Sequence, residues 1–85
     1  MSYDVVWGPR AEAMLADIWL AAEDRAAVSS ASAWLDAQLA RSPLMLGESR
    51  ESSVRRVAYY RPIGIEFEVV EDDKRVVVQG VFAAE

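Results

Sequence analysis

The change of hydrophobic period near residue 54 constrains the fold of this 85-residue chain more than any other feature. From Val54 onward apolar and polar residues alternate, as in a β-strand, and no helical spacing returns before Glu85. Three strands are predicted, near 54–60 and at 63–70 and 75–81, with a turn at 71–74 between the last two. The face of strand 63–70 expected to meet the helices consists of Ile63, Ile65, Phe67 and Val69. The C-terminal third is therefore predicted to form a β-hairpin.

The N-terminal segment predicts a short strand followed by an amphipathic helix. Aromatic and β-branched residues over 3–7 favour a strand, and Gly8-Pro9 ends it. Proline suits the first turn of a helix because its missing N–H would be unpaired there anyway. The apolar residues that follow share one helical face: Ala11, Met14, Leu15, Ile18, Trp19 and Ala22. The first helix therefore has one apolar side available for packing.

A second helix is predicted after the three charged residues 23–25. Asp24 is suited to cap it by accepting backbone N–H bonds. Pro43 ends it near Arg41, because a residue before proline is pushed out of the helical region. Its apolar positions are Ala27, Val28, Ala31, Trp34, Leu35 and Leu39. Because the connection between the helices is short, the two are predicted to form an antiparallel hairpin.

The predicted element order is β-α-α-β-β-β, which belongs to the α+β class. We expect a helical hairpin packed on one face of a small, mostly antiparallel four-stranded sheet. One helix pair covers one face, so the other face is expected to stay open to a partner. The apolar helical positions and the strand end predict that three tryptophans lie in the core: Trp7, Trp19 and Trp34. A chain of this length is expected to form a single domain over residues 1–85.

The residue types present limit the chemistry that the chain can perform. It contains no cysteine and no histidine, which excludes disulfides, thiolate metal sites and the usual general base near neutral pH. Nine basic and fourteen acidic residues give a net charge of -5, which opposes non-specific attraction to nucleic acid. No apolar run approaches the roughly 20 residues needed to cross a bilayer, and no signal peptide pattern is present. We therefore expect a cytoplasmic protein without a cofactor and without membrane contact.

An arginine-rich stretch provides the best candidate site. Four of the nine basic residues lie within twelve positions: Arg50, Arg55, Arg56 and Arg61. A guanidinium group suits phosphate because its planar fork binds two oxygens at once. The alternative is that these arginines form cross-strand ion pairs with Glu66 and Glu68. The pattern of residues 54–60 leaves open which arginines point inward.

Two further groups near this stretch carry hypotheses of their own. Tyr59 and Tyr60 precede Arg61, and an aromatic side chain beside arginine on an open sheet can hold an unstacked base. Adjacent strand residues point to opposite faces, so only one tyrosine can take part. Glu66 and Glu68 share a strand face and would suit acid and base catalysis, although a solvated or ion-paired role is commoner.

Taken together, these segments resemble the RelE/ParE superfamily, the toxins of type II toxin–antitoxin systems that are also known as plasmid stabilisation proteins. The residues that carry the resemblance are Trp7 at a strand end, the helix through Leu15, Ile18 and Trp19, the helix end Arg41-Ser42-Pro43, and the hairpin 67–78. The resemblance covers nearly the whole chain. It implies a compact toxin held by a cognate antitoxin in a hetero-oligomer. Some members act as mRNA interferases on the ribosome, and others inhibit DNA gyrase.

The resemblance also implies roles for individual residues. The family's arginine on the second strand corresponds to Arg56, or to Arg61 if the strand shifts, and Glu48 matches a catalytic glutamate of some members. The residues assigned to target binding are Arg50, Arg55, Tyr59 and Tyr60. The arginine of the third strand is replaced by Gly64, and the C-terminal His, Arg or Tyr of many nucleases by residues 82–85. These departures favour a ParE-like toxin, or a catalytically degenerate interaction module without toxicity, over a ribonuclease.

Overall fold

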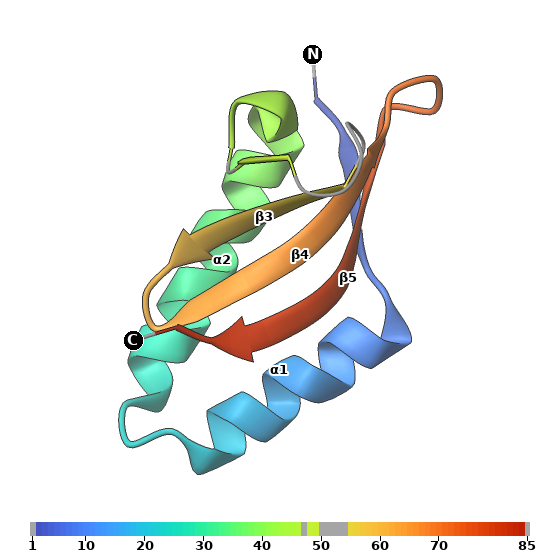
Figure 1. Ribbon diagram of the computed structural model, residues 1–85. Helices are drawn as coiled ribbons and strands as arrows, with labels where there is room; N and C mark the ends of the chain where they lie inside the picture. Colours follow the sequence, from blue (N-terminus) through green and yellow to red (C-terminus); the bar gives the residue numbers. More distant parts are fainter. Residues whose placement is uncertain (1, 47, 50–54, 85) are drawn as a thin grey trace.

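The structure is a computed structural model that describes residues 2–46, 48–49 and 55–84. Its elements are β1 (Asp4–Trp7), α1 (Pro9–Ala21), α2 (Arg25–Arg41), a 3₁₀ helix η1 (Pro43–Met45), β2 (Glu48–Ser49), β3 (Arg55–Tyr60), β4 (Ile63–Val70) and β5 (Arg75–Ala83). This order confirms the predicted α+β class and the order β-α-α-β-β-β, with η1 and the two-residue strand β2 inserted between α2 and β3 (Figure 1). No helix among the described residues is long and apolar enough to span a membrane.

The sheet has the strand order β1-β5-β4-β3-β2. Strand β1 runs parallel to β5, and every other neighbouring pair is antiparallel. The four predicted strands are therefore present in a mostly antiparallel sheet, and β2 extends its edge by pairing with Arg56 and Val57 of β3. The parallel β1–β5 pair brings the first strand of the chain against the last.

A bulge changes the side-chain alternation in β5. Glu66 pairs with Gly80 and Phe67 pairs with Val78, which leaves Gln79 as an extra residue. Val78 and Val81 therefore both face the helices, although they lie three positions apart. A simple period of two would have placed one of them on the opposite face.

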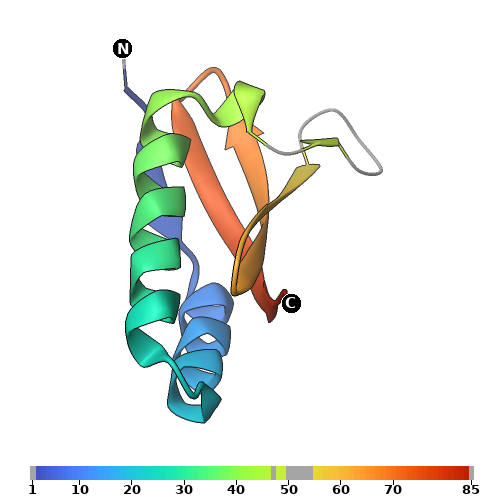
Figure 2. The same cartoon turned by 90° about the vertical axis from the view of Figure 1, so that its left-hand side faces the viewer.

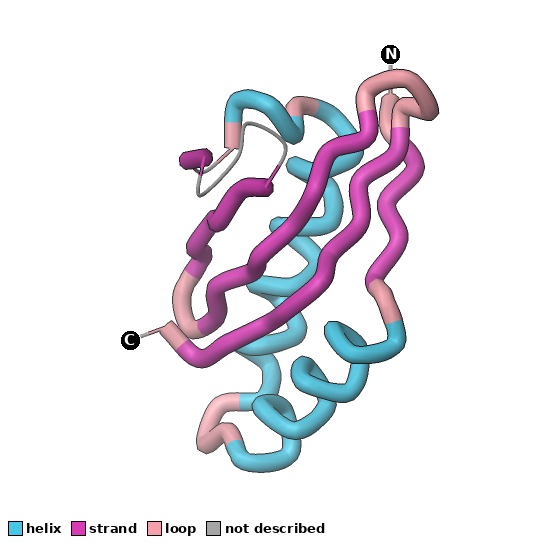
Figure 3. The backbone as a smooth tube through the Cα atoms, turned by 45° about the vertical axis from the view of Figure 1, so that its right-hand side comes forward, coloured by secondary structure: helices cyan, strands magenta, loops and turns pink. Residues whose placement is uncertain are grey.

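Both helices lie on one face of the sheet, as predicted (Figure 2). They meet at the short connection between Ala21 and Arg25 and splay apart toward their other ends (Figure 1). Figure 3 shows that this connection projects beyond the end of β5. The hairpin is thus V-shaped, and its closed end overhangs the sheet.

The core lies between the two helices and the sheet. Its largest fully buried side chains are Leu35, Leu39, Ile63, Ile65, Phe67, Val76, Val78 and Val81. The predicted inward face of β4 is confirmed, because every second residue from Ile63 to Val69 is buried. In α1, all of which is described, Ala11 alone is buried. The first helix therefore packs on the sheet mainly through half-buried side chains, among them Met14, Leu15 and Ile18.

The prediction that all three tryptophans lie in the core is wrong. Trp7 is half-buried, whereas Trp19 is 39% exposed and Trp34 is 37% exposed. Trp19 lies beneath the guanidinium group of Arg25, at 4.6 Å from its ring centroid, and Trp34 stacks on Tyr60. Helical spacing marks an apolar side that is wider than the narrow sheet can cover, so aromatic residues at its margin stay at the surface.

Candidate functional site

Strand β3 directs its two adjacent arginines to opposite faces. Arg56 pairs with Phe67, a core residue, so its side chain starts on the face toward the helices. There the half-buried Arg56 donates an N–H bond from Nε to the carbonyl oxygen of Leu46, at 3.1 Å. Arg55 pairs with Glu68 and belongs to the open face. The structure thus decides which arginine points inward, and it gives Arg56 a contact that secures the segment after α2.

The other predicted site residues are spread over the edge and the end of the sheet. Arg61 is exposed in the turn after β3, about 20 Å along the strand from Arg55 at the usual rise per residue. Glu48 lies in β2, where its backbone pairs with Val57, and Arg50 lies outside the described residues. The described arginines are therefore not brought together into one phosphate-binding cluster, and the roles assigned to these residues stay predictions.

The two predicted tyrosines lie on opposite faces, as expected for neighbours on a strand. Tyr60 stacks on Trp34 with 4.2 Å between ring centroids, and this contact joins the edge of the sheet to α2. Tyr59 is 52% exposed on the open face and meets Phe82 edge-on, at 5.6 Å between centroids and 77° between planes. Tyr59 is therefore the tyrosine that is available on the open face.

Gly64 explains how these two rings come together. It lies between Tyr59 and Phe82 in the register of the sheet, at the position where the family resemblance expects an arginine. A Cβ atom on Gly64 would lie 2.5 Å from Cε2 of Phe82 and 3.1 Å from Cδ2 of Tyr59. The missing side chain lets the Phe82 ring lie across β4. This end of the open face thus presents two aromatic rings where the family resemblance expects the cation of an arginine. We call Tyr59, Phe82 and the intervening Gly64 the aromatic cluster.

The middle of the open face is rich in carboxylates. Glu66 and Glu68 are both half-buried there. Nε2 of Gln79 donates a long hydrogen bond of 3.5 Å to Glu68, and Arg55 lies directly opposite Glu68 in the register. Carboxylates next to exposed aromatic rings suit contacts with another protein better than contacts with a polyanion.

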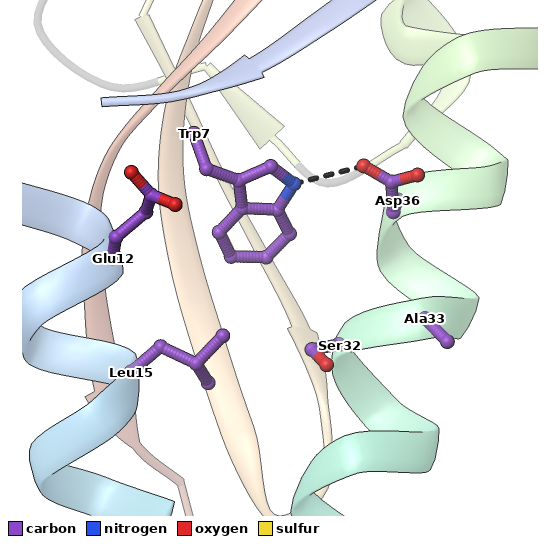
Figure 4. Close-up of a pocket in the computed structure, with 6 residues that line it drawn as sticks. All are labelled: Trp7, Glu12, Leu15, Ser32, Ala33 and Asp36. Carbon is purple, nitrogen blue, oxygen red and sulfur yellow. Dashed lines mark hydrogen bonds between the residues drawn. The ribbon is translucent and has the colours of Figure 1, made fainter. Parts of the chain in front are cut away.

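A groove between the two helices is the second feature of interest, and sequence reasoning missed it. A cavity of about 430 Å³ is lined by Trp7, Glu12, Leu15, Ser32, Ala33 and Asp36 (Figure 4). A second hollow of about 320 Å³ shares Glu12, Leu15 and Ser32 with it and extends to Trp19 and Val28. We call the two together the helix groove. The signal in the sequence is the run of small residues over 29–33 of α2, of which Ser29, Ser32 and Ala33 line the space between the helices.

Trp7 and Asp36 determine the character of this groove. Nε1 of Trp7 donates a hydrogen bond to Oδ1 of Asp36 at 2.8 Å, which holds the indole ring between the helices (Figure 4). Glu12 faces this pair from α1, the helix that also contributes Leu15, so carboxylates lie on both walls and the indole ring lies between them. The groove combines a large aromatic surface with hydrogen-bonding rims, a combination typical of protein-binding surfaces.

Comparisons with known proteins bear on the fold. A scan against protein-family models and a search of curated proteins give no match. Among solved structures, the chain is similar to one in the RelBE2 toxin–antitoxin complex from Mycobacterium tuberculosis, with 18% identity and a TM-score of 0.79 over 98% of this chain and 99% of that chain. It is also similar to one in a chromosomal ParDE toxin–antitoxin system from P. aeruginosa, with 15% identity and a TM-score of 0.73 over 98% and 97%. The predicted likeness to the RelE/ParE superfamily is confirmed at the level of the fold.

Proposed function

We propose that this chain is the toxin component of a type II toxin–antitoxin pair, which acts in the cytoplasm and is neutralised by a cognate antitoxin in a hetero-oligomer. The observation that carries the proposal is the full-length fold similarity, since both solved structures are toxin–antitoxin assemblies. Their chains and this one match over at least 97% of their lengths. The similarity therefore extends over nearly the whole of each matched chain and is not confined to one part of it.

We further propose that the toxin acts by binding a protein target such as DNA gyrase, and not by cutting mRNA. The support comes from the aromatic cluster, in which Phe82 fills the space beside Gly64 where a nuclease of this family would place an arginine. The net charge of -5 and the carboxylates of Glu66 and Glu68 also disfavour a ribosome-bound RNA substrate. Exposed aromatic side chains are common hot spots in protein interfaces.

The helix groove is the surface that we assign to the antitoxin. Its indole ring at Trp7 and its carboxylate walls at Glu12 and Asp36 offer apolar area and hydrogen-bond acceptors to a packed segment. The groove lies on the helical side and the aromatic cluster on the open face of the sheet. An antitoxin seated in the groove would therefore have to extend around an edge of the sheet to cover the target-binding face.

Induced expression in a bacterium tests the toxin assignment. We expect growth arrest with reduced DNA supercoiling and with transcripts that show no new codon-linked cuts in primer-extension mapping. Replacing Tyr59 by alanine is expected to relieve the arrest, because it removes the most exposed ring of the aromatic cluster. Arg10→Ala is the matched control, since Arg10 is exposed on α1 on the other side of the molecule.

Two outcomes would contradict this assignment in different ways. New cuts at defined codon positions would identify an mRNA interferase and overturn the protein-target proposal. Absence of any effect on growth, with the chain present at high level, would favour the alternative of a non-toxic interaction module. The replacement of the expected nuclease residues at Gly64 and over 82–84 is what favours that alternative.

A further inference from the structure

A large cavity lies where the helical hairpin overhangs the sheet. Its volume is about 820 Å³, within the range typical of ligand-binding cavities. The helices contribute Ile18, Ala22 and Val28 to its lining, and the sheet contributes Pro62 and Ala83. The connection between α1 and α2, which projects beyond the end of β5, is visible in Figures 1 and 3. We call this space the end cavity.

The end cavity exists because apolar positions of α1 continue past the end of the strands. Ile18 and Ala22 belong to the apolar side of α1, yet both remain half-buried. Strand β5 ends at Ala83, so no further strand residue lies beneath them. The neighbouring side chains are small, because Ala21 and Ala27 also line the space. An apolar surface of this kind is typical of a site that a partner covers.

The charges around the end cavity indicate what kind of partner fits. Asp17, Glu23 and Asp24 line it together with a single cation, Arg61. Three carboxylates and one guanidinium group give this rim a net charge of -2 (1 − 3). The rim has the same sign as the whole chain, whose net charge is -5. A cationic side chain is therefore favoured here and an acidic one is repelled.

The guanidinium group of the adjacent Arg25 bonds to backbone carbonyl groups at the end of α1. Its Nε donates a hydrogen bond to the carbonyl oxygen of Trp19 at 3.1 Å, and its Nη2 donates one to the carbonyl oxygen of Leu20 at 3.0 Å. The same guanidinium group lies over the Trp19 ring. Arg25 is thus engaged with the C-terminal turn of α1, and it is absent from the lining of the end cavity.

We propose that the end cavity receives a segment of the partner protein that carries lysine or arginine next to apolar side chains. The identification of the partner as the antitoxin rests on the proposed function. The apolar side chains would cover Ile18 and Ala22, and the cation would lie among Asp17, Glu23 and Asp24. This binding surface is separate from the helix groove, because the two share Val28 alone.

A designed peptide pair tests the cavity without knowledge of the antitoxin. The probe is a short amidated peptide of leucine, alanine and lysine, and its matched partner carries glutamate in place of every lysine. In titrations of the ¹⁵N-labelled chain, the lysine peptide is expected to shift the amide signals of Ile18, Ala22 and Ala27, which line the end cavity and not the helix groove. The glutamate peptide is expected to leave them unchanged.

Three variants distinguish binding in the end cavity from binding at other surfaces. Ala21→Trp fills the end cavity from an exposed position and is expected to abolish the shifts, whereas Ala33→Trp, exposed in the helix groove, is expected to leave them intact. The triple variant Asp17→Asn, Glu23→Gln, Asp24→Asn is expected to weaken binding of the lysine peptide about tenfold, because three screened charge interactions are lost. Asparagine at 24 retains the helix cap.

Three results would overturn the proposal. These are shifts centred on Leu15 and Trp19 in the helix groove, equal binding of the glutamate peptide, and undiminished binding by a folded Ala21→Trp chain. The growth assay reports separately on the toxin assignment. If the lysine peptide binds to a chain that does not affect growth, the end cavity is supported as a site for a cationic and apolar segment. The assignment of that segment to an antitoxin is then rejected.

Discussion

At the scale of single residues, Gly64 shows how one missing side chain changes the chemistry of a face. Its Cα hydrogen leaves the space into which the Phe82 ring packs, next to Tyr59. Glycine inside a strand weakens it unless a neighbour covers the gap, and an aromatic ring across the glycine does so. The same residue therefore removes a candidate catalytic position and builds the aromatic cluster.

We predict that Gly64→Ala lowers the free energy of unfolding by about 1 kcal/mol, because the new Cβ collides with the Phe82 ring and displaces it. Urea denaturation followed by circular dichroism measures this change. In a Phe82→Ala background the same substitution is expected to cost much less, since the two closest atoms are gone and only the 3.1 Å approach to Tyr59 is left. An equal loss in both backgrounds would show that the ring is not the cause.

A second residue-scale feature joins the start of the chain to the turn between β4 and β5. The Tyr3 hydroxyl donates a hydrogen bond to Oε1 of Glu71, and Nζ of Lys74 lies 3.2 Å from the same oxygen. The hydrogen bond from Tyr3, followed by that from Lys74, lowers the pKa of Glu71 below its ordinary value of 4.5. The bond to Glu71 raises the pKa of Tyr3 in turn.

These shifts predict an acid-sensitive contribution to stability. Because the folded pKa of Glu71 is lowered, its contribution is present above the unfolded pKa and is lost as the pH falls through the folded pKa. In Tyr3→Phe we expect the Glu71 pKa to rise toward 4.5 and the acid-induced loss of stability to shrink. Carbon-13 NMR titration of the Glu71 carboxyl group measures the pKa. An unchanged value in Tyr3→Phe would contradict the assigned cause.

At the scale of elements, the two helices differ in how they are secured. Helix α2 is capped by Asp24, whose Oδ1 accepts a hydrogen bond from the Ala27 N–H at 3.0 Å. It is also joined to β1 through Trp7 and to β3 through Tyr60. Helix α1 begins at Pro9 without a side-chain cap and buries only Ala11. Helix α2 is therefore secured by polar and aromatic contacts, whereas α1 is held mainly by apolar side chains that pack against the core.

The cap of α2 gives a prediction at this scale. Asp24→Ala is expected to lower the free energy of unfolding by about 1 kcal/mol, because the Ala27 N–H loses its acceptor. Asp24→Asn is expected to change it little, since an asparagine side chain caps equally well. Thermal or urea denaturation of the two variants measures the difference. Equal losses would assign the effect to the charge of Asp24 and not to its hydrogen bond.

At the scale of the whole molecule, charge separates the candidate functions. The net charge of -5 and the half-buried Glu66 and Glu68 on the open face oppose contact with a phosphate backbone. The same face carries exposed Tyr59, which suits a protein partner. A protein-binding toxin is thus consistent both with the composition and with the arrangement of the open face.

We predict that the chain does not bind a labelled single-stranded RNA saturably at about 0.15 M salt, because its fourteen acidic residues outnumber its nine basic ones and the described arginines of β3 and the turn after it are not clustered. Fluorescence anisotropy measures this. The double variant Glu66→Lys, Glu68→Lys is the matched comparison and is expected to bind weakly and in a salt-sensitive way, since it reverses two charges on the open face. Tight binding by the unaltered chain would revive the nuclease alternative.

The local sequence pattern was sufficient to predict the two long helices, the four longer strands and part of the core, but not η1 or β2. The alternation at 63–69 predicted the inward face of β4, and Asp24 and Pro43 predicted the bounds of α2. Each of these depends on neighbours a few positions away, through strand pleat, side-chain capping or the proline ring. The bulge at Gln79 escaped prediction because it depends on how β5 pairs with β4.

The sequence by itself determined the α+β class, the element order and the absence of cysteine and histidine chemistry. Only the tertiary structure decided that Arg56 points toward the helices and Arg55 to the open face, and that Trp19 and Trp34 stay at the surface. The helix groove and the end cavity also emerged only there. The physical reason is that period and propensity are local, whereas register, the splay of two helices and the reach of a sheet beneath them depend on contacts between distant segments.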